Sequence, residues 1–299
     1  MLADYVIGID CGGTHTEGYA YNQKGKEEYH FHGGQANLMA NANQAFENVS
    51  LILSQFFKSL NRKECKLILI GFAGLGVYGQ QDKIIKKLGL EDMNVRLVSD
   101  ADIALINVLR GQDGLLVIAG TGTVVLGQQG LQKIRIGGWG HLLGDEGGGY
   151  FLGRSAYKKV TDDYDEGQYT DFSNEFMKHL GVSNVFSAVN DFYSKSKSEV
   201  GQQALFVAAR SDQLDEDAQL LIRNAATALS RQVILGISRL NIKGSVTIGL
   251  SGSLVEHNAL YEETLRARVQ RKCDNVLYTK AIKNQNNAKA AFYAYQSWQ

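Results

Sequence analysis

The chain has 299 residues, and its 31 Lys and Arg balance its 31 Asp and Glu. This length suits two domains, or one large one, with a core that needs no disulfide or metal to fold. The zero net charge argues against a nucleic-acid binder, because binding led by phosphate contacts requires a basic excess. The cysteines Cys11, Cys65 and Cys273 are scattered and form no CxxC motif, which argues against a zinc ribbon and favours a reducing compartment.

Neither the N-terminus nor the longest uncharged run carries a targeting or membrane signal. Residues 1–10 lack the basic region and long apolar region of a secretory signal. Residues 114–132 are too rich in glycine, threonine and glutamine to span a membrane. We therefore expect a cytoplasmic globular protein with no membrane or nucleic-acid partner.

Strand and helix patterns alternate along the first part of the chain. Apolar runs predict strands at 5–11, 16–21, 27–31, 66–72 and 95–98, of which the first three form a meander around a glycine turn. Helical spacing predicts helices at 42–60, 81–88 and 101–109. This alternation predicts an α/β protein with a partly parallel sheet.

The same pattern of strand, glycine turn, strand, turn and strand restarts at residue 115, with strands predicted at 115–119, 124–128 and 133–136. We interpret the restart as an internal duplication, with an N-terminal domain at 1–114 and a C-terminal domain at 115–299. The pattern then predicts mostly helices from 150 to about 240, and we interpret this segment as a helical insertion in the second domain. The remaining predictions are strands at 245–251 and 276–279 and helices at 260–272 and from 288.

A glycine turn follows the first strand of each meander. The turns are Asp10-Cys11-Gly12-Gly13-Thr14 and Gly120-Thr121-Gly122-Thr123. Glycines let backbone N–H groups approach a phosphate closely, and Asp10 could hold Mg²⁺ through water. Each turn on its own could equally be an ordinary hairpin turn. The sequence contains no GxxxxGK[ST], which excludes a P-loop NTPase at the level of motifs.

Two other strand ends carry candidate contacts. Asp100 follows a strand and precedes a helix, at the edge where open α/β sheets place ligands, so it could accept a proton from a substrate hydroxyl. Its alternative role is that of a helix N-cap. The segment Gly249-Leu250-Ser251-Gly252-Ser253 could lie against a purine and its ribose, or it could simply connect a strand to a helix.

The segment GGWGHLLGDEGGG, at 137–149, has seven glycines in thirteen positions. This composition is typical of a loop that grips a ligand. Asp145 and Glu146 could accept hydrogen bonds from sugar hydroxyls, and Trp139 offers a flat apolar face. The alternative is a flexible surface loop with Trp139 as a core anchor.

Two further patterns suggest other chemistry. The segment GLGVYG at 74–79, with Asp100 21 residues later, imitates a dinucleotide-binding fingerprint and would suggest a nicotinamide oxidoreductase. That interpretation leaves the other glycine motifs unexplained. His30 and His32 would share one face of a strand, so a metal pair is conceivable, but no third ligand is in view and a solvated face is preferred.

In this order, the motifs resemble the N-acetylglucosamine kinases and glucosamine kinases of the BadF/BadG/BcrA/BcrD ATPase family, within the sugar kinase and actin superfamily. The resemblance spans most of the chain, and GGWGHLLGDEGG is its most specific element. It implies two ribonuclease-H-like domains with a ligand cleft between them, ATP and Mg²⁺ as cofactors, a small sugar substrate and a homodimer. It also implies that a C-terminal helix at about 288–299 packs on the first domain.

The resemblance assigns a role to each motif. It makes Gly12, Gly13 and Thr14 the first phosphate loop, residues 120–123 the second, and Gly249, Ser251, Gly252 and Ser253 the adenosine loop. Asp100 matches the catalytic base. The expected sugar contacts are Asn37, Gly74, Asp100, Thr121, Gly138, Trp139 and Asp145. The sequence departs from the family pattern in NNAKAAFYAY, at 286–295, which is less rich in glycine, and after Asn258, where proline is expected.

The implied reaction transfers the γ-phosphoryl group of ATP to a sugar hydroxyl, with position 6 expected. N-acetylglucosamine is the first expected substrate and glucosamine the second. A sugar sensor that binds without phosphorylating is the alternative, although sensing needs no base such as Asp100. An NAD-dependent oxidoreductase is the weaker alternative.

Overall fold

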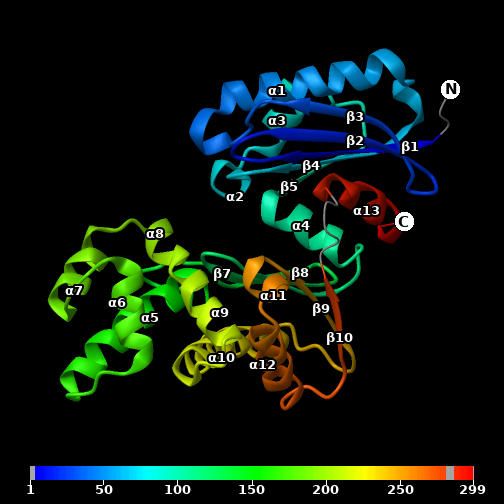
Figure 1. Cartoon of the computed structure of the whole chain (residues 1–299). Helices are drawn as coiled ribbons and strands as arrows, with labels where there is room; N and C mark the ends of the chain where they lie inside the picture. Colours follow the sequence, from blue (N-terminus) through cyan, green and yellow to red (C-terminus); the bar gives the residue numbers. More distant parts are fainter. Residues whose placement is uncertain (1–3, 281–285, 299) are drawn as a thin grey trace. The chain divides into compact units, whose positions relative to one another are not determined.

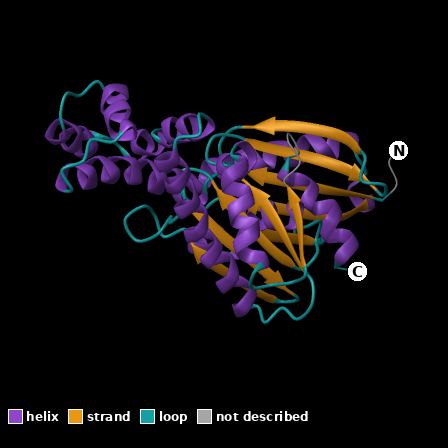
Figure 2. Cartoon of the chain, turned by 60° about the horizontal axis from the view of Figure 1, so that its bottom comes forward, coloured by secondary structure: helices purple, strands orange, loops and turns teal. Residues whose placement is uncertain are grey.

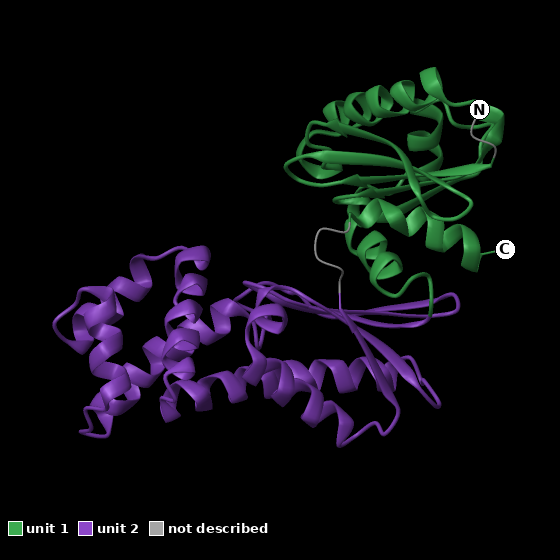
Figure 3. Ribbon diagram, turned by 45° about the vertical axis from the view of Figure 1, so that its right-hand side comes forward, with its two compact units in different colours: residues 1–112, 281–299 green, residues 113–280 purple. Residues whose placement is uncertain are grey.

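The computed structural model describes residues 4–280 and 286–298, and the chain divides into two compact units. Unit 1 comprises residues 1–112 and 281–299, and unit 2 comprises residues 113–280 (Figure 3). Each unit contains one five-stranded mixed sheet with helices, so the predicted α/β class is confirmed. Within the described ranges, no helix combines the length and the apolar character that crossing a membrane requires.

The sheet of unit 1 has the strand order β3-β2-β1-β4-β5. The first three strands form the predicted antiparallel meander, and β4 and β5 continue it in parallel with β1. The strands are β1 (Tyr5–Cys11), β2 (Thr16–Asn22), β3 (Glu27–Gly33), β4 (Cys65–Phe72) and β5 (Val95–Ser99). Helices cover both faces of the sheet at its centre. The central strand β1 is therefore almost entirely buried, which suits its mostly apolar sequence.

Helices lie on both faces of this sheet (Figure 1). Alternate residues of β4 point to opposite faces, so Ile68 and Ile70 pack with α1 while Leu67 and Leu69 pack with α4 and α13. The helices of unit 1 are α1 (Leu38–Ser59), α2 (Leu75–Tyr78), α3 (Gln81–Lys87), α4 (Asp100–Val108) and α13 (Ala290–Ser297), with short 3₁₀ segments at Arg62–Glu64 and Asn287–Lys289. The C-terminal helix thus packs on the sheet of unit 1; Gln299 lies outside the described residues.

The sheet of unit 2 repeats this topology, with the order β10-β9-β6-β7-β8. Its meander is again antiparallel, and β9 and β10 again continue it in parallel. The strands are β6 (Gly114–Ala119), β7 (Thr123–Gln129), β8 (Gln132–Gly137), β9 (Val246–Ser251) and β10 (Val276–Lys280). The two sheets thus share one strand order and one pairing pattern, as the two predicted meanders indicate.

The helices of unit 2 fall into two groups. The predicted long helix is α10 (Glu216–Arg239), which packs on β6, β7 and β8 and on α12. The helix α11 (Ser253–His257) packs on β6 and β9, and α12 (Ala259–Gln270) packs on α10 and α11. The inserted helices gather at one end of the unit (Figure 2) and are α5 (Gly149–Asp165), α6 (Asp171–Leu180), α7 (Val185–Ser194), α8 (Lys197–Gln202) and α9 (Ala204–Asp212).

A glycine in β1 allows the C-terminal segment to pack on unit 1. A Cβ atom at Gly8 would lie 1.8 Å from the carbonyl oxygen of Ala288. Because that neighbour is backbone, it cannot move aside as a flexible side chain would. The contact therefore fixes how closely the C-terminal segment approaches the sheet.

We expect Gly8→Ala to lower the free energy of unfolding by about 1–3 kcal/mol, the usual cost of overpacking a core. Gly76→Ala is the matched control, because a Cβ at Gly76 has no heavy atom within 4 Å. Its effect should stay within about 1 kcal/mol. Urea denaturation of both variants measures the difference. Equal midpoints for the two variants would contradict the packing described for the C-terminal segment.

Candidate active site

The candidate residues of unit 1 gather at one edge of its sheet. The strands β1, β4 and β5 are parallel, and Cys11, Phe72 and Ser99 lie side by side in register at their carboxyl ends. This is the edge where open α/β sheets bind ligands. Asp10, Gly74 and Asp100 lie at or directly after these strand ends, and a β-bridge to Ala73 places Asn37 beside them.

The turn after β1 is exposed and held by backbone bonds. The N–H of Gly12 donates to the carbonyl of His15 at 3.0 Å, and the carbonyl of Gly12 accepts from the N–H of Ala36 at 3.1 Å. A Cβ at Gly13 would meet no heavy atom within 4 Å, so space surrounds the centre of the turn. The hydroxyl of Thr14 lies 2.9 Å from His15 Nδ1. This is an open turn that an anion can approach closely.

Asp10 lies beside this turn at the end of β1. Asn287 Nδ2 donates to Asp10 Oδ2 at 3.0 Å. Burial raises the pKa of Asp10; the bond from Asn287 lowers it, and the nearby charges of Asp100 and Glu17 raise it again. A bound cation stabilises the charged form of a partly buried carboxylate that has acidic neighbours. The oxygen atoms of Asp10 are therefore suitable ligands for Mg²⁺, either directly or through water.

Asn37 and Gly74 lie next to each other, because a β-bridge joins Asn37 to Ala73. Asn37 Oδ1 caps α1 by accepting from the N–H groups of Met39 at 2.9 Å and Ala40 at 3.2 Å. A sugar could therefore contact the amide Nδ2 of Asn37 without disturbing the cap. Gly74 has a φ of 81° and is the N-cap that precedes α2, a helix of four residues. The segment 74–79 thus lacks the longer helix that a dinucleotide fingerprint opens.

Asp100 is the first residue of α4 and is exposed. Its alternative role as the N-cap is wrong, since Ser99 caps the helix by accepting from the N–H of Asp102 at 3.0 Å. Asp100 Oδ1 accepts from the N–H of Ala101 at 2.9 Å. The carboxylate is thus oriented by the helix and open to solvent at the sheet edge.

In unit 2, the turn after β6 is bound to the end of the glycine-rich segment. Gly120 N–H donates to the carbonyl of Gly122 at 3.0 Å, which closes the turn. The carbonyls of Gly120 and Thr121 accept from the N–H groups of Gly149 at 2.8 Å and Tyr150 at 2.9 Å, at the start of α5. Thr123 is buried at the start of β7, and its hydroxyl donates to the carbonyl of Glu146 at 3.0 Å.

The predicted adenosine segment lies against the same turn. A Cβ at Gly252 would be 2.4 Å from the carbonyl oxygen of Ala119, and the φ of Gly252 is 105°. Both facts require glycine at this position. Ser251 ends β9 and Ser253 begins α11, whereas Gly249 lies inside β9. Residues 251–253 and 120–123 are therefore neighbours at one edge of the sheet of unit 2.

The glycine-rich segment contains an exposed tryptophan. The side chain of Trp139 is 63% exposed, so its alternative role as a core anchor is wrong. The guanidinium of Arg135 lies over the indole at 5.1 Å and also donates to the carbonyls of Gly137 and Gly138. Gly138 has a φ of 70°, which favours glycine. Trp139 is thus held by a cation–π contact at the surface of unit 2.

The two acidic residues of this segment differ in burial, since Asp145 is buried and Glu146 is exposed. Asp145 is 4% exposed, has a φ of 62°, and pairs with Lys197 Nζ through Oδ2 at 2.7 Å. A Cβ at Gly122 would lie 2.5 Å from Asp145 Oδ2, so the carboxylate is packed against the turn after β6. Glu146 is exposed and accepts from Gln232 Nε2 at 3.1 Å.

Lys197 and Asn287 contact predicted site residues, and no sequence motif predicts either contact. Lys197 lies 52 residues beyond Asp145, and Asn287 lies 277 residues beyond Asp10. Neither belongs to a glycine motif. The only sequence signal near Asn287 was the departure of 286–295 from the family pattern.

We expect Lys197→Met to lower the free energy of unfolding by about 1–3 kcal/mol, because the buried Asp145 carboxylate would lose its cation. Lys158→Met is the control, since its pair with Asp162 is exposed and should change stability by about 0.5 kcal/mol or less. Thermal unfolding of both variants and of Asp145→Asn/Lys197→Met tests the pair. If the double variant is no more stable than Lys197→Met, the pairing is not the cause.

Comparisons with known proteins agree with this fold. The chain is 28% identical over 277 residues to N-acetylmuramic acid/N-acetylglucosamine kinase of Clostridium acetobutylicum, covering 87% of this chain and 88% of the relative. It is 26% identical to N-acetyl-D-glucosamine kinase of Dictyostelium discoideum, covering 92% and 93%. The structure of a ROK hexokinase from Thermus thermophilus matches with a TM-score of 0.58 and 14% identity, covering 98% and 99%. The model of the BadF/BadG/BcrA/BcrD ATPase family matches residues 7–285, and the chain belongs to this family.

Proposed function

We propose that the chain is an ATP-dependent kinase that transfers the γ-phosphoryl group to a hydroxyl of an amino sugar. N-acetylglucosamine is the first candidate substrate and glucosamine the second. Membership of an ATPase family and the activities named for the two curated relatives support this proposal. The observation that carries it is the exposed carboxylate of Asp100 at the sheet edge that also holds the glycine turn and Asp10.

The two glycine turns are the proposed phosphate-binding elements. They occupy equivalent places in the repeated sheets, directly after β1 and β6. Backbone N–H groups of Gly12–Thr14 and of Gly120–Thr123 would each bind phosphate oxygens of ATP, with residues 251–253 against its adenosine. Mg²⁺ near Asp10 would neutralise phosphate charge, the usual role of this ion in phosphoryl transfer.

Asp100 is the proposed general base. Its carboxylate would take the proton of the sugar hydroxyl as that oxygen forms a bond to the γ-phosphorus, while the bond from the γ-phosphorus to ADP breaks. The 6-hydroxyl is the proposed acceptor. The protein's contribution is mainly positioning and electrostatic stabilisation, because the transition state of phosphoryl transfer needs little covalent help.

The remaining predicted contacts would orient the sugar. Asn37 Nδ2 would donate to a sugar oxygen while Oδ1 keeps its role as a helix cap. Asp145 Oδ1 would accept from a hydroxyl, because Oδ2 is paired with Lys197. Trp139 would offer the face of its indole. Gly74, Thr121 and Gly138 would bring backbone close to the sugar.

We expect Asp100→Asn to lose turnover by about 10²–10⁴-fold, the usual contribution of a general base, while the protein keeps its fold and its sugar affinity. Asp82→Asn is the matched control, because Asp82 is another exposed aspartate in the first turn of a helix of unit 1. ADP release with Mg-ATP is measured against N-acetylglucosamine, glucosamine, N-acetylmuramic acid, N-acetylmannosamine and glucose. Sugar binding to both variants is measured by calorimetry.

The results separate an error about the role of Asp100 from an error about the kinase activity itself. Turnover by Asp100→Asn equal to that of Asp82→Asn would refute the assignment of the base. Sugar binding without sugar-dependent ADP release would instead indicate a sensor. An analogue of the best sugar that lacks the 6-hydroxyl should bind but release no ADP, and phosphorylation of that analogue would refute the proposed position.

A further inference from the structure

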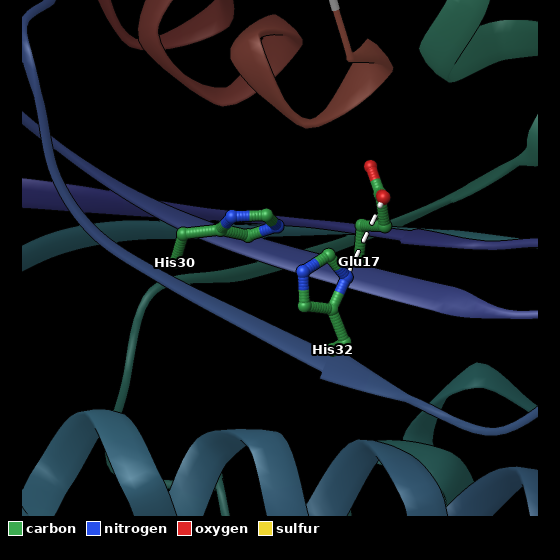
Figure 4. Close-up of side chains that lie close together, drawn as sticks. All are labelled: Glu17, His30 and His32. Atoms are coloured by element: carbon green, nitrogen blue, oxygen red, sulfur yellow. Dashed lines mark ion pairs between the residues drawn. The ribbon is translucent and has the colours of Figure 1, made fainter.

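A histidine pair and a glutamate meet on one face of the sheet of unit 1, near its edge (Figure 4). Glu17 on β2 lies directly opposite His32 on β3, and His30 lies two residues before His32 on the same face. One potential ligand atom from each residue lies within 4.8 Å of the others. The sequence pattern indicated only the two histidines as a possible metal pair. The pairing of β2 with β3 adds the carboxylate of Glu17.

His30 is oriented toward this cluster. Its ring stacks on Tyr19 with the centroids 3.8 Å apart and meets His32 edge-on at 4.1 Å, and it extends toward Glu17 and His32 (Figure 4). Its Nε2 is buried and has no hydrogen-bond partner among the described residues. A buried polar atom without a partner costs free energy, and a ligand that fills the space would recover it.

The spacing of Glu17 and His32 is close to that of two ligands in a metal site. His32 Nδ1 lies 3.6 Å from Glu17 Oε1. Around a tetrahedral zinc ion with bonds of about 2.0–2.1 Å, neighbouring ligand atoms lie about 3.3–3.4 Å apart. His32 is exposed, so a small rotation of its side chain can close the remaining difference.

We propose that Glu17, His30 and His32 bind a divalent transition-metal ion of the zinc class. Two imidazoles and one carboxylate suit Zn²⁺ or Co²⁺ better than Mg²⁺, which prefers an all-oxygen shell. Three protein ligands leave one coordination position for water. The ion would tie β3, at the edge of the sheet, to its neighbour β2. The proposed kinase activity does not enter this inference.

The test titrates Zn²⁺ into the chelator-treated full chain by calorimetry and follows Co²⁺ by absorption. We expect one ion per chain. Glu17→Gln and His32→Gln should each weaken its binding by at least about 10-fold, because mutating a residue that only hydrogen-bonds to a metal ligand already has an effect of this size. Zn²⁺ should also raise the melting temperature of the unaltered chain more than that of the variants. His257→Gln is the control, because His257 is an exposed histidine in unit 2.

The control tests whether an exposed histidine outside the site accounts for the binding. Absence of Zn²⁺ binding, or equal affinity in the unaltered chain and both variants, would overturn the proposal. A loss in His257→Gln as large as that in His32→Gln would also overturn it, because surface histidines would then explain the binding. Metal-free melting curves of the two site variants should match the unaltered chain, which shows that a loss of binding is not a loss of fold.

Discussion

Parallel pairing at the centre of each sheet is the constraint on which the proposed site depends. In unit 1, the register that places Cys11, Phe72 and Ser99 side by side makes three chain segments leave the sheet at one edge. In unit 2, the pairing of Ile118 with Ser251 does the same for β6 and β9. Helices cover both faces of the unit 1 sheet at its centre, where β1 and β4 are largely buried, so the polar groups of the proposed site lie at the carboxyl ends of these strands or in the segments that follow.

Close backbone contacts then fix the turns of unit 2. A Cβ at Gly148 would lie 2.8 Å from the carbonyl oxygen of Thr121, and one at Gly252 would lie 2.4 Å from that of Ala119. Three segments of the chain thus touch through backbone at one edge. The same tight packing buries the carboxylate of Asp145 beside Gly122, and Lys197 supplies the charge that this burial requires. These contacts restrict the conformations open to the turns, and a restricted turn loses less entropy when it binds a ligand.

The sequence predicted those features that depend on local patterns. Apolar runs placed the ten strands, and the recurring meander predicted the duplicated topology. The start of α1 was placed late, at 42 instead of Leu38, because a kink at Asn41, which has non-helical φ and ψ, separates the first turn capped by Asn37 from the rest of the helix. The helix α2 was missed because four residues between glycines carry no periodicity.

The features that the sequence did not predict depend on long-range contacts. The side chains of Ser99 and Asp100 are both good N-caps, and only the structure shows that Ser99 takes this role. Lys197 reaches Asp145 from an inserted helix, and Glu17 joins His30 and His32 only through strand register. The roles of Asp10, Asp100 and the sugar-side residues stay predictions, because they concern ligands.

The central claim is that the turns after β1 and β6 are both phosphate-binding elements for ATP. Hydrogen–deuterium exchange with and without Mg²⁺ and a nonhydrolysable ATP analogue tests it most directly. The account predicts slower exchange in peptides that cover residues 12–15 and in peptides that cover 120–123, with no change in α7 as the internal reference. Protection of one turn alone, or of neither while the nucleotide is bound, would contradict it.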